Sequence, residues 1–334
     1  MTGPLANVAR AKADEFVGRV PVRLAPERLA ALSRTNWLIT AAHVALEWSG
    51  IVAAIVLCER FWHPLSYLVA VVWIGARQHA LVVFMHDGAH VRLCRSRRWN
   101  DWLSDVFLAW PVFAATWAYR ENHFAHHRHL NTDDDPDWVR KRNTAWEFPK
   151  NPLSLTVMFA RDALGLNPHQ LVFTVLALSG FAGYARQARN GNTPAYLAAR
   201  LVYYTVAALL LWRMELGKVF LLYWVIPLAT WFMFAMHVRS VAEHFAIPQQ
   251  HVLNASRTTY ASWWERLLLI PKNVGYHLDH HLFPSVPFYR LPQLHAELMS
   301  HARFAEQAHV TDTYLGVLRE CAGVRVRPAT DRRG

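Results

Sequence analysis

The sequence contains little cysteine and few charges for its length. Only 3 of its 334 residues are cysteine, and these three, Cys58, Cys94 and Cys321, are widely separated. A disulfide scaffold needs an even set of cysteines, and a thiolate iron–sulfur cluster needs four, so both are excluded. Charged residues make up 18% of the chain, below the roughly 25% that is usual in soluble domains.

Apolar residues, by contrast, are abundant and lie in long runs. Hydrophobic residues make up 53% of the chain and include 15 tryptophans, which excludes an intrinsically disordered protein. A net charge of +11 suits either nucleic acid or an anionic membrane face. Because the apolar runs are long enough for a bilayer, a membrane is the expected partner and nucleic acid is not.

Four apolar runs approach the roughly 20 residues that a transmembrane helix needs. They cover residues 37–58, 65–85, 196–212 and 219–237, and short polar turns join them in pairs. Arginines flank the open ends of the first pair, which predicts that both ends are cytoplasmic. The predicted fold is an all-α, multi-pass membrane protein with four transmembrane helices in two hairpins, plus interfacial helices.

Two further apolar stretches are short for a span. We expect 103–118 to be interfacial or re-entrant, and 170–185 to be interfacial, because a spanning helix there would place the histidine groups on opposite sides of the membrane. Trp263–Ile270 should form an amphipathic interfacial helix, because tryptophan favours the membrane–water boundary. The predicted division is a cytosolic segment 1–35, a membrane domain 36–302 and a basic cytosolic tail 303–334.

Three groups of histidines stand beside the apolar runs. They are His86 and His90, the triplet His123, His126 and His127, and the triplet His277, His280 and His281. Residues three and four apart share one face of a helix, so the rings of each group project together. Imidazole binds iron, zinc, copper or nickel, and eight imidazoles are too many for one tetrahedral zinc. A chance or surface cluster would explain one group but not three, so the sequence predicts a site for two metals.

Other polar residues near these groups are candidates for supporting roles. His244 follows the fourth run on the same side as the boxes and is a further candidate ligand. Metal-bound histidine usually donates its second N–H to a carboxylate, carbonyl or water, and the alternative for a carboxylate is a solvated or salt-bridged side chain. The carboxylate candidates for this role are Asp87, Glu243 and Asp279. Asn273 lies four residues before His277 on the same helix face and is a further candidate, although it could equally cap the helix. The residues 133–137 are interpreted as a capped turn.

The remaining histidines receive other interpretations. His79 and His237 each lie seven residues before a candidate ligand, on the same helix face. They could line a substrate channel, and the alternative is a buried, hydrogen-bonded histidine, because polar groups at membrane depth need polar surroundings. His129 lies off the face of its triplet. The C-terminal histidines have no matching spacing and are expected on the surface; they are His295, His301 and His309.

The three groups resemble the histidine boxes of the membrane fatty acid desaturase family, whose superfamily also includes membrane hydroxylases and carotenoid ketolases. The strings 123–137 and 273–287 resemble the bacterial acyl-lipid branch, and the resemblance covers residues 36–298. It implies four transmembrane helices capped by a cytosolic helical region, in which nine histidines, His244 included, hold two Fe2+ ions. Ser240 stands where the stearoyl-CoA type has an asparagine that reaches one metal through water, so the surroundings of that metal should differ.

The resemblance also implies an O2-dependent reaction on an apolar chain. The leading hypothesis is a desaturase of a lipid-linked fatty acyl chain, supplied with electrons by ferredoxin, rubredoxin or a cytochrome b5-like donor with its reductase. The alternative at the same site is hydroxylation or ketolation of an acyl chain, carotenoid or other apolar substrate. A membrane metal transporter or sensor is the alternative from another class. Such proteins usually carry ionisable residues near the bilayer midplane, whereas the ionisable residues here cluster at the ends of the spans, with the exception of Arg77–His79. The protein is expected in a bacterial inner membrane, with its metal site and both termini in the cytoplasm.

Overall fold

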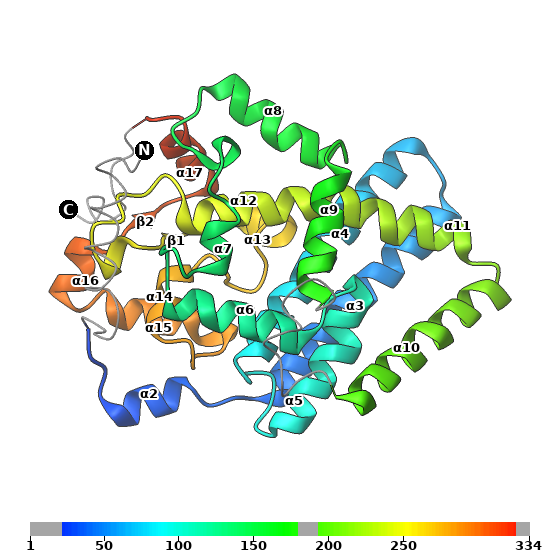
Figure 1. Cartoon of the computed structure of the whole chain (residues 1–334), viewed down its shortest axis with the longest axis horizontal. Helices are drawn as coiled ribbons and strands as arrows, with labels where there is room; N and C mark the ends of the chain where they lie inside the picture. The colour runs from blue at the N-terminus through cyan, green and yellow to red at the C-terminus, as the bar shows by residue number, and fades with distance from the viewer. Residues whose placement is uncertain (1–21, 180–192, 325–334) are drawn as a thin grey trace. The chain divides into compact units, whose positions relative to one another are not determined.

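The computed structural model describes residues 22–179 and 193–324, and within them the chain is mostly helical, with long loops and one pair of two-residue strands (Figure 1). The chain divides into two compact units. Unit 1 comprises residues 1–35, 122–158 and 237–334, and unit 2 comprises residues 36–121 and 159–236. Three helices continue from one unit into the other: α6 (Thr116–Arg128), α8 (Pro152–Ala163) and α12 (Met233–His244).

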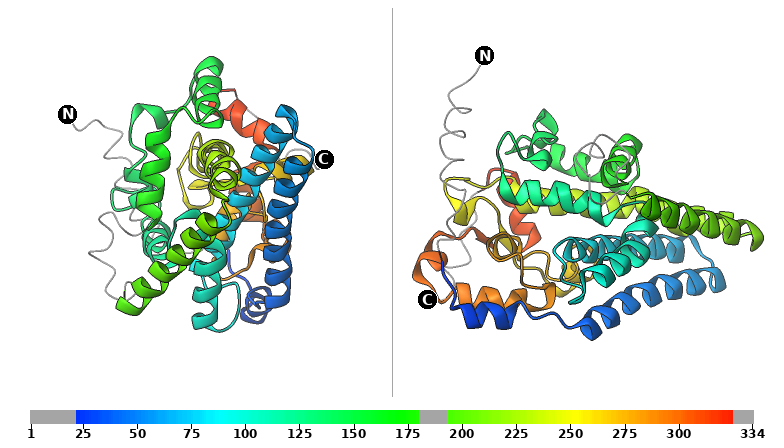
Figure 2. Two further views of the ribbon diagram at one scale, coloured as in Figure 1. Left: turned by 90° about the vertical axis from the view of Figure 1, so that its right-hand side faces the viewer. Right: turned by 60° about the horizontal axis from the view of Figure 1, so that its bottom comes forward.

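Unit 2 contains the long apolar helices. Helices α3 (Trp37–Arg60) and α4 (Pro64–Ala89) form a hairpin and lie side by side in both views of Figure 2. After α10 (Pro194–Arg213), the chain turns into α11 (Gly217–Phe220) and runs through π-helical turns at Leu221–Val225 and Leu228–Phe232 into α12.

Local sequence explains where these helices begin. The Asn36 side chain accepts a hydrogen bond from Leu38 N, and Thr193 accepts one from Tyr196 N, so both residues cap a helix start. Pro64 and Pro194 occupy first helical positions, where the missing N–H costs nothing.

Within the described residues, four helical segments are long and apolar enough to cross a membrane. They are Pro26–Arg60, Pro64–Ala89, Pro194–Arg213 and Gly217–His244, and they confirm the four predicted spans. Large apolar side chains remain exposed along them, including Leu46, Val56, Leu201 and Leu209. An exposed apolar surface of this kind would be unusual in contact with water, whereas a surface that faces lipid must be apolar.

The two shorter apolar stretches form short elements. Residues 103–118 fall in α5 (Arg97–Ser104), a π-helical turn at Asp105–Ala109, a 3-10 turn at Trp110–Val112 and the start of α6. The other stretch contributes to α9 (Pro168–Ser179), which has 12 residues; residues 180–185 lie outside the described residues.

Helix α4 forms the centre of unit 2. It packs against α3, the turn at Asp105–Ala109 and the turn at Leu228–Phe232. Ile74, Leu81, Phe84 and Met85 are completely buried. The C-terminal end of this central helix carries His86, and His90 follows as its cap residue.

Unit 1 is built from short helices around a second core. Its helices are α2 (Pro26–Leu32), α7 (Pro136–Val139), α13 (Trp263–Leu268), α14 (His277–Leu282), α15 (Leu291–Leu298), α16 (Ala302–Gln307) and α17 (Tyr314–Cys321). Strands β1 (Thr258–Thr259) and β2 (Val310–Thr311) pair in parallel, with Thr258 opposite Val310. The core packs α14 and α15 together through Leu278, Leu294 and their neighbours.

The predicted amphipathic helix at residues 263–270 is present as α13, which ends at Leu268 and exposes Trp263 and Trp264. Residues 1–21 of the predicted N-terminal segment and 325–334 of the predicted basic tail lie outside the described residues.

Candidate metal centre

Seven histidines of unit 1 come together from three helices. Helix α6 carries one box triplet, α14 carries another, and His244 is the last residue of α12. They fall into two sets by proximity. The first set is His123, His127 and His280, and the second set is His126, His244, His277 and His281; within each, one nitrogen of every ring lies within 4.8 Å of the others.

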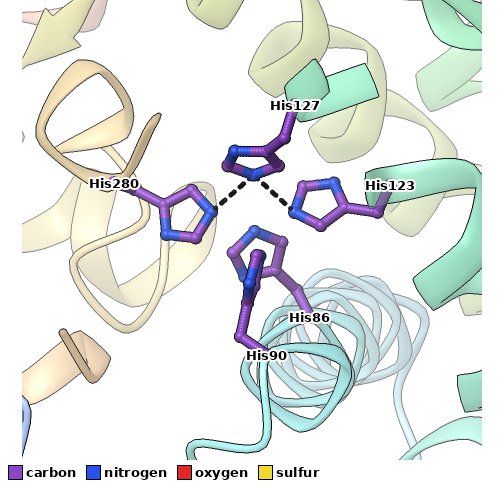
Figure 3. A group of neighbouring side chains, drawn as sticks. All are labelled: His86, His90, His123, His127 and His280. Atoms are coloured by element: carbon purple, nitrogen blue, oxygen red, sulfur yellow. Dashed lines mark hydrogen bonds between the residues drawn. The ribbon is translucent and has the colours of Figure 1, made fainter. Parts of the chain in front are cut away.

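The ring nitrogens of each set converge on one point. In the first set, His127 Nε2 lies 3.0 Å from His123 Nε2 and 3.1 Å from His280 Nε2 (Figure 3). In the second set, His277 Nε2 lies 2.9 Å from His244 Nε2 and 3.0 Å from His281 Nε2. Several imidazole nitrogens aimed at one point are what a metal ion requires of its ligands.

Unit 2 contributes the other box. His86 and His90, labelled in Figure 3, lie at the end of α4 with their ring centroids 5.2 Å apart. His86 also contacts the Tyr119 ring, at 6.2 Å between centroids. Between the two histidines, a Cβ on Gly88 would collide with the Ser104 side chain, so this position needs glycine for the close approach of α5.

Carboxylates hold the second nitrogen of two histidines in the second set. His126 Nδ1 lies 2.8 Å from Asp135 Oδ2, and both side chains are buried. His277 Nδ1 lies 3.3 Å from Glu243 Oε1, which also accepts a hydrogen bond of 2.6 Å from Arg239. Such carboxylates fix the tautomer and the orientation of a ligating ring, leaving Nε2 for the metal.

The role of Asp135 was missed by sequence reasoning, which interpreted residues 133–137 as a capped turn. Asp135 does cap α7, because Oδ1 accepts from the N–H groups of Asp137 and Trp138. Its other oxygen faces His126, nine residues earlier in the chain. No spacing rule links a helix histidine to a cap in the following loop, so the sequence carried no signal for this contact.

Burial favours the neutral, metal-binding form of these imidazoles. Burial, together with the charges of Arg92 and Arg120, lowers the pKa of His90 to about 3. Burial and the neighbouring His281, His244 and His280 rings hold the pKa of His277 well below its usual value. At neutral pH both rings therefore offer an unprotonated nitrogen to a metal.

The predicted supporting residues divide into those near a box histidine and those elsewhere. Asp87 Oδ1 lies 3.5 Å from His86 Nδ1, and Glu243 contacts His277 as described. Ser240 Oγ instead accepts a hydrogen bond of 2.6 Å from Lys141. Lys141 also lies over the Trp146 ring, and burial lowers the pKa of its ammonium group. Ser240 thus holds the ammonium group of Lys141 in unit 1 through this hydrogen bond.

Two predictions about the C-terminal region, one for Asn273 and one for His295, were wrong. Asn273 is not on a helix face shared with His277, because α14 begins only at His277 and Asn273 has a left-handed φ of 56°. Its side chain donates to the Phe288 carbonyl. His295 is not on the surface: it is 5% exposed and lies 2.8 Å from Asp279 Oδ1.

Asp279 lies on α14 between the box histidines but serves a different network. One oxygen pairs with His295, and the other accepts a hydrogen bond of 2.5 Å from Thr258 on β1. The other ring nitrogen of His295 lies 2.7 Å from the Tyr260 hydroxyl. The network joins α14 to β1 and α15 through fully or nearly buried side chains.

The two candidate channel histidines are both buried. His79 packs edge-on against Phe232 within unit 2, with ring centroids 6.4 Å apart. His237 lies 4.5 Å from the Trp146 ring within unit 1. A channel role for either stays a prediction.

The donor set fits a pair of transition-metal ions. All the converging donors are imidazoles, which suit iron, zinc, copper and nickel, and no thiolate is among them. The described residues thus combine four candidate membrane spans with a histidine-rich centre for two metals. These features define an integral membrane metalloprotein.

Comparison with known proteins narrows this class. The fatty acid desaturase family model matches residues 61–313. Among curated proteins, the chain is 26% identical to dihydrorhizobitoxine desaturase of Bradyrhizobium elkanii, over 82% of this chain and 79% of that protein. It is 29% identical to human sphingolipid delta(4)-desaturase/C4-monooxygenase DES2, over 74% and 72%. It is 26% identical to beta-carotene ketolase of a Paracoccus species, over 79% and 93%.

The chain therefore belongs to the fatty acid desaturase family. It is an oxidoreductase of that family, and its histidine sets are compatible with a dimetal site.

Proposed function

We propose that this protein uses two iron ions and O2 to introduce a double bond into a lipid-linked fatty acyl chain. The observation that carries the proposal is the convergence of the box histidines in two sets, in a chain with four apolar spans. The family match and the desaturases among its relatives support the reaction class.

The proposed ligand set has nine histidines. We assign His126, His244, His277 and His281 to one iron, and His123, His127 and His280, together with His86 and His90 of unit 2, to the other. Chain continuity supports this second assignment. Arg120 on α6 donates to Gly88 O and Ala89 O at the end of α4, and His123 follows one turn later on the same helix.

The overall reaction removes two hydrogens from neighbouring carbons and reduces O2 to two waters with two external electrons and two protons. When bound, the iron ions supply O2 reduction and the oxidising power for C–H cleavage. The chain's own residues have other tasks. Buried neutral imidazoles offer nitrogen donors, Asp135 and Glu243 orient two of them, and the apolar spans provide surroundings for an alkyl chain. His79 and His237 are proposed to line the substrate channel.

The second candidate function is oxygenation at the same site. One relative is named as a desaturase/monooxygenase and another as a ketolase, and these names support oxygenation as the second candidate function. Hydroxylation and desaturation differ in whether oxygen is added to the substrate carbon or a second hydrogen is removed. That choice depends on small differences in substrate placement, and the product mass distinguishes the outcomes.

Lipid mass spectrometry on cells that express the protein tests the proposal. We expect species lighter by two hydrogens with the wild type and not with His127→Ala, because His127 is central to the first set. His129→Ala is the matched control, since His129 directly follows α6, lies outside both sets and should retain activity. Species heavier by one oxygen would instead establish the oxygenase. If His127→Ala kept the activity, the metal-site assignment would be wrong.

The electrons must come from a separate donor, for which we propose an acidic ferredoxin, rubredoxin or cytochrome b5-like protein. The net charge of +11 and the exposed Arg95, Arg97 and Arg98 at the start of α5 support electrostatic docking. Turnover with an acidic donor should fall as ionic strength rises from 0.02 to about 0.3 M, because salt screens exposed charges. Stopped-flow reduction at several salt concentrations measures this, and a flat response would reject electrostatic docking.

A further inference from the structure

Arg257 is a buried cation at the end of the helix that carries His244. Its side chain is fully buried, and Nη1 donates to Ala242 O at 2.6 Å. Nη2 donates to Phe245 O and Ala246 O, both at 3.1 Å. The last carbonyls of a helix have no partners within it, and a cation there also complements the helix dipole. Arg257 therefore caps the C-terminal end of α12, where His244 is the last residue.

The backbone of Arg257 joins two of the histidine-bearing helices. Its N–H donates to Glu243 O at the end of α12, at 3.0 Å, and its carbonyl accepts from Leu278 N at the start of α14, at 3.3 Å. These two bonds lie beside His244 and His277, whose Nε2 atoms are 2.9 Å apart. One residue thus sets the spacing of two members of the second set.

A carboxylate fixes the Arg257 side chain in turn. Glu320 on α17 accepts a hydrogen bond of 2.6 Å from Nη2. Thr311 donates to the other Glu320 oxygen, and His309 lies 2.9 Å from the first. Burial alone would raise the pKa of Glu320, but the hydrogen bond with His309 and the charge of Arg257 outweigh it, so the carboxyl stays ionised at neutral pH.

Arg120 forms the equivalent arrangement in unit 2. Its Nε donates to Ala89 O at 2.7 Å and Nη2 to Gly88 O at 3.0 Å, at the end of the helix that carries His86 and His90. Asp101 on α5 binds both Nη atoms. Like Arg257, it is a buried arginine that caps a ligand-bearing helix and is held by an acid from another element.

We propose that Arg257 and Arg120 are positioning residues, each of which fixes the histidines of one metal site. Arg257 serves the second set, which contains His244 and His277, and Arg120 serves the metal site to which His86 and His90 are assigned. This inference rests on the proposed dimetal function. A positioning role differs from a general role in folding, because the loss of each arginine should weaken the binding of one metal and leave the other metal bound.

The test measures metal binding to purified, metal-free protein in detergent, by titration with Co2+ and by elemental analysis. Wild type should bind two equivalents. Arg257→Gln and Arg120→Gln should each keep one tight equivalent and weaken the other about 10–100-fold, the usual cost of losing a group that orients metal ligands. Arg200→Gln is the matched control: Arg200 is buried and donates to Ser179 O and Phe113 O, and the change should leave both equivalents tight.

Combining each change with a ligand substitution identifies the affected metal. Arg257→Gln should add nothing to His244→Ala, but with His90→Ala it should weaken both equivalents; Arg120→Gln should show the reverse pattern. Arg257→Lys and Arg120→Lys, which keep the charge but lose the two-armed donor, should be intermediate and serve if the glutamine variants do not fold. The inference would be overturned if a glutamine or lysine variant bound two tight equivalents of metal, or if one variant weakened both metal equivalents equally. Failure of the wild type to bind two would instead overturn the proposed function.

Discussion

At the scale of single residues, neighbours in the fold give chemically identical side chains different tasks. His126 and His277 each turn Nδ1 to a carboxylate and Nε2 to the second set, whereas His295 places both nitrogens in a network with Asp279 and Tyr260. The acids differ in the same way. Glu243 faces a box histidine, but Asp279, although it lies within a box, does not serve one. The assignment of roles therefore follows contacts and not sequence proximity.

Asp105 carries a pH dependence at this scale. It lies in the π-helical turn before α6, outside the four candidate spans, and accepts a hydrogen bond from Thr116 N at the start of α6. Burial raises the pKa of Asp105 to about 6, in spite of hydrogen bonds from Thr116. An unfolded aspartate has a pKa of about 3.9, so the folded protein holds this proton to a higher pH. The carboxyl therefore contributes most stability below about pH 4 and loses it as pH rises to about 6.

We predict that Asp105→Asn removes this dependence. The Tm of the metal-free protein in detergent should be compared for wild type and variant between pH 4 and 7. The wild-type Tm minus the variant Tm should fall as pH rises, because only the wild type must ionise a buried carboxyl. Protonation of buried histidines affects both proteins and cancels in the difference. A difference that stays constant or grows with pH would contradict the assignment.

At the scale of elements, an ion pair joins the two helices of the first hairpin. Glu47 in the middle of α3 lies 2.9 Å from Arg77 in α4, and both side chains are buried. The guanidinium also lies over the Trp73 ring at 4.6 Å. Arg77 interrupts the second apolar run of the sequence, but no linear pattern indicates its partner. The pair lets both helices remain membrane-compatible despite two ionisable residues.

Removal of one member of this pair should be strongly destabilising. We predict that Glu47→Gln lowers the free energy of unfolding by about 3–5 kcal/mol, because a buried cation loses its counter-charge. The double change Glu47→Leu with Arg77→Met should restore most of the loss. Glu297→Gln is the control, since its pair with Arg28 is partly exposed and worth less than about 1 kcal/mol. Equal effects of the two glutamine variants, measured by denaturation in detergent, would refute a special role for the buried pair.

At the scale of the whole molecule, two hairpins return the chain to one side of the membrane, and we propose that this is the cytoplasmic side of a bacterial inner membrane. The turns that join the paired spans, Phe61–His63 and Met214–Leu216, are then periplasmic. The proposed orientation would place the arginines at residues 92–98 in the cytoplasm, as the positive-inside rule predicts.

Cysteine labelling tests this orientation. In a Cys94→Ser background, which leaves the buried Cys58 and Cys321, an impermeant maleimide should reach Trp62→Cys and Met214→Cys only from the periplasmic side. Arg98→Cys in unit 2 and Arg303→Cys in unit 1 should react only from the cytoplasmic side. If the last two reacted from opposite sides, the box histidines could not share one centre, and the metal-site proposal would fail.

Much of the fold was predictable because the membrane restricts what a chain can do. A bilayer requires long apolar helices, so composition alone located the four spans. Helical spacing likewise predicted that each histidine triplet would present one face, as α6 and α14 do. The prediction failed where a helix was assumed: Asn273 lies in a turn with a left-handed φ, and no periodicity reports such a residue.

The sequence by itself determined the class of protein, the spans and the identity of the histidines, because these depend on residue type and local spacing. Only the tertiary structure decided which histidines share a set, and which acids and arginines hold them. Asp135, Arg257 and Glu320 reach the site through contacts between elements that are distant in the chain or separated by loops. Such contacts arise from packing and from the need to pair buried polar groups, and a linear pattern does not encode them.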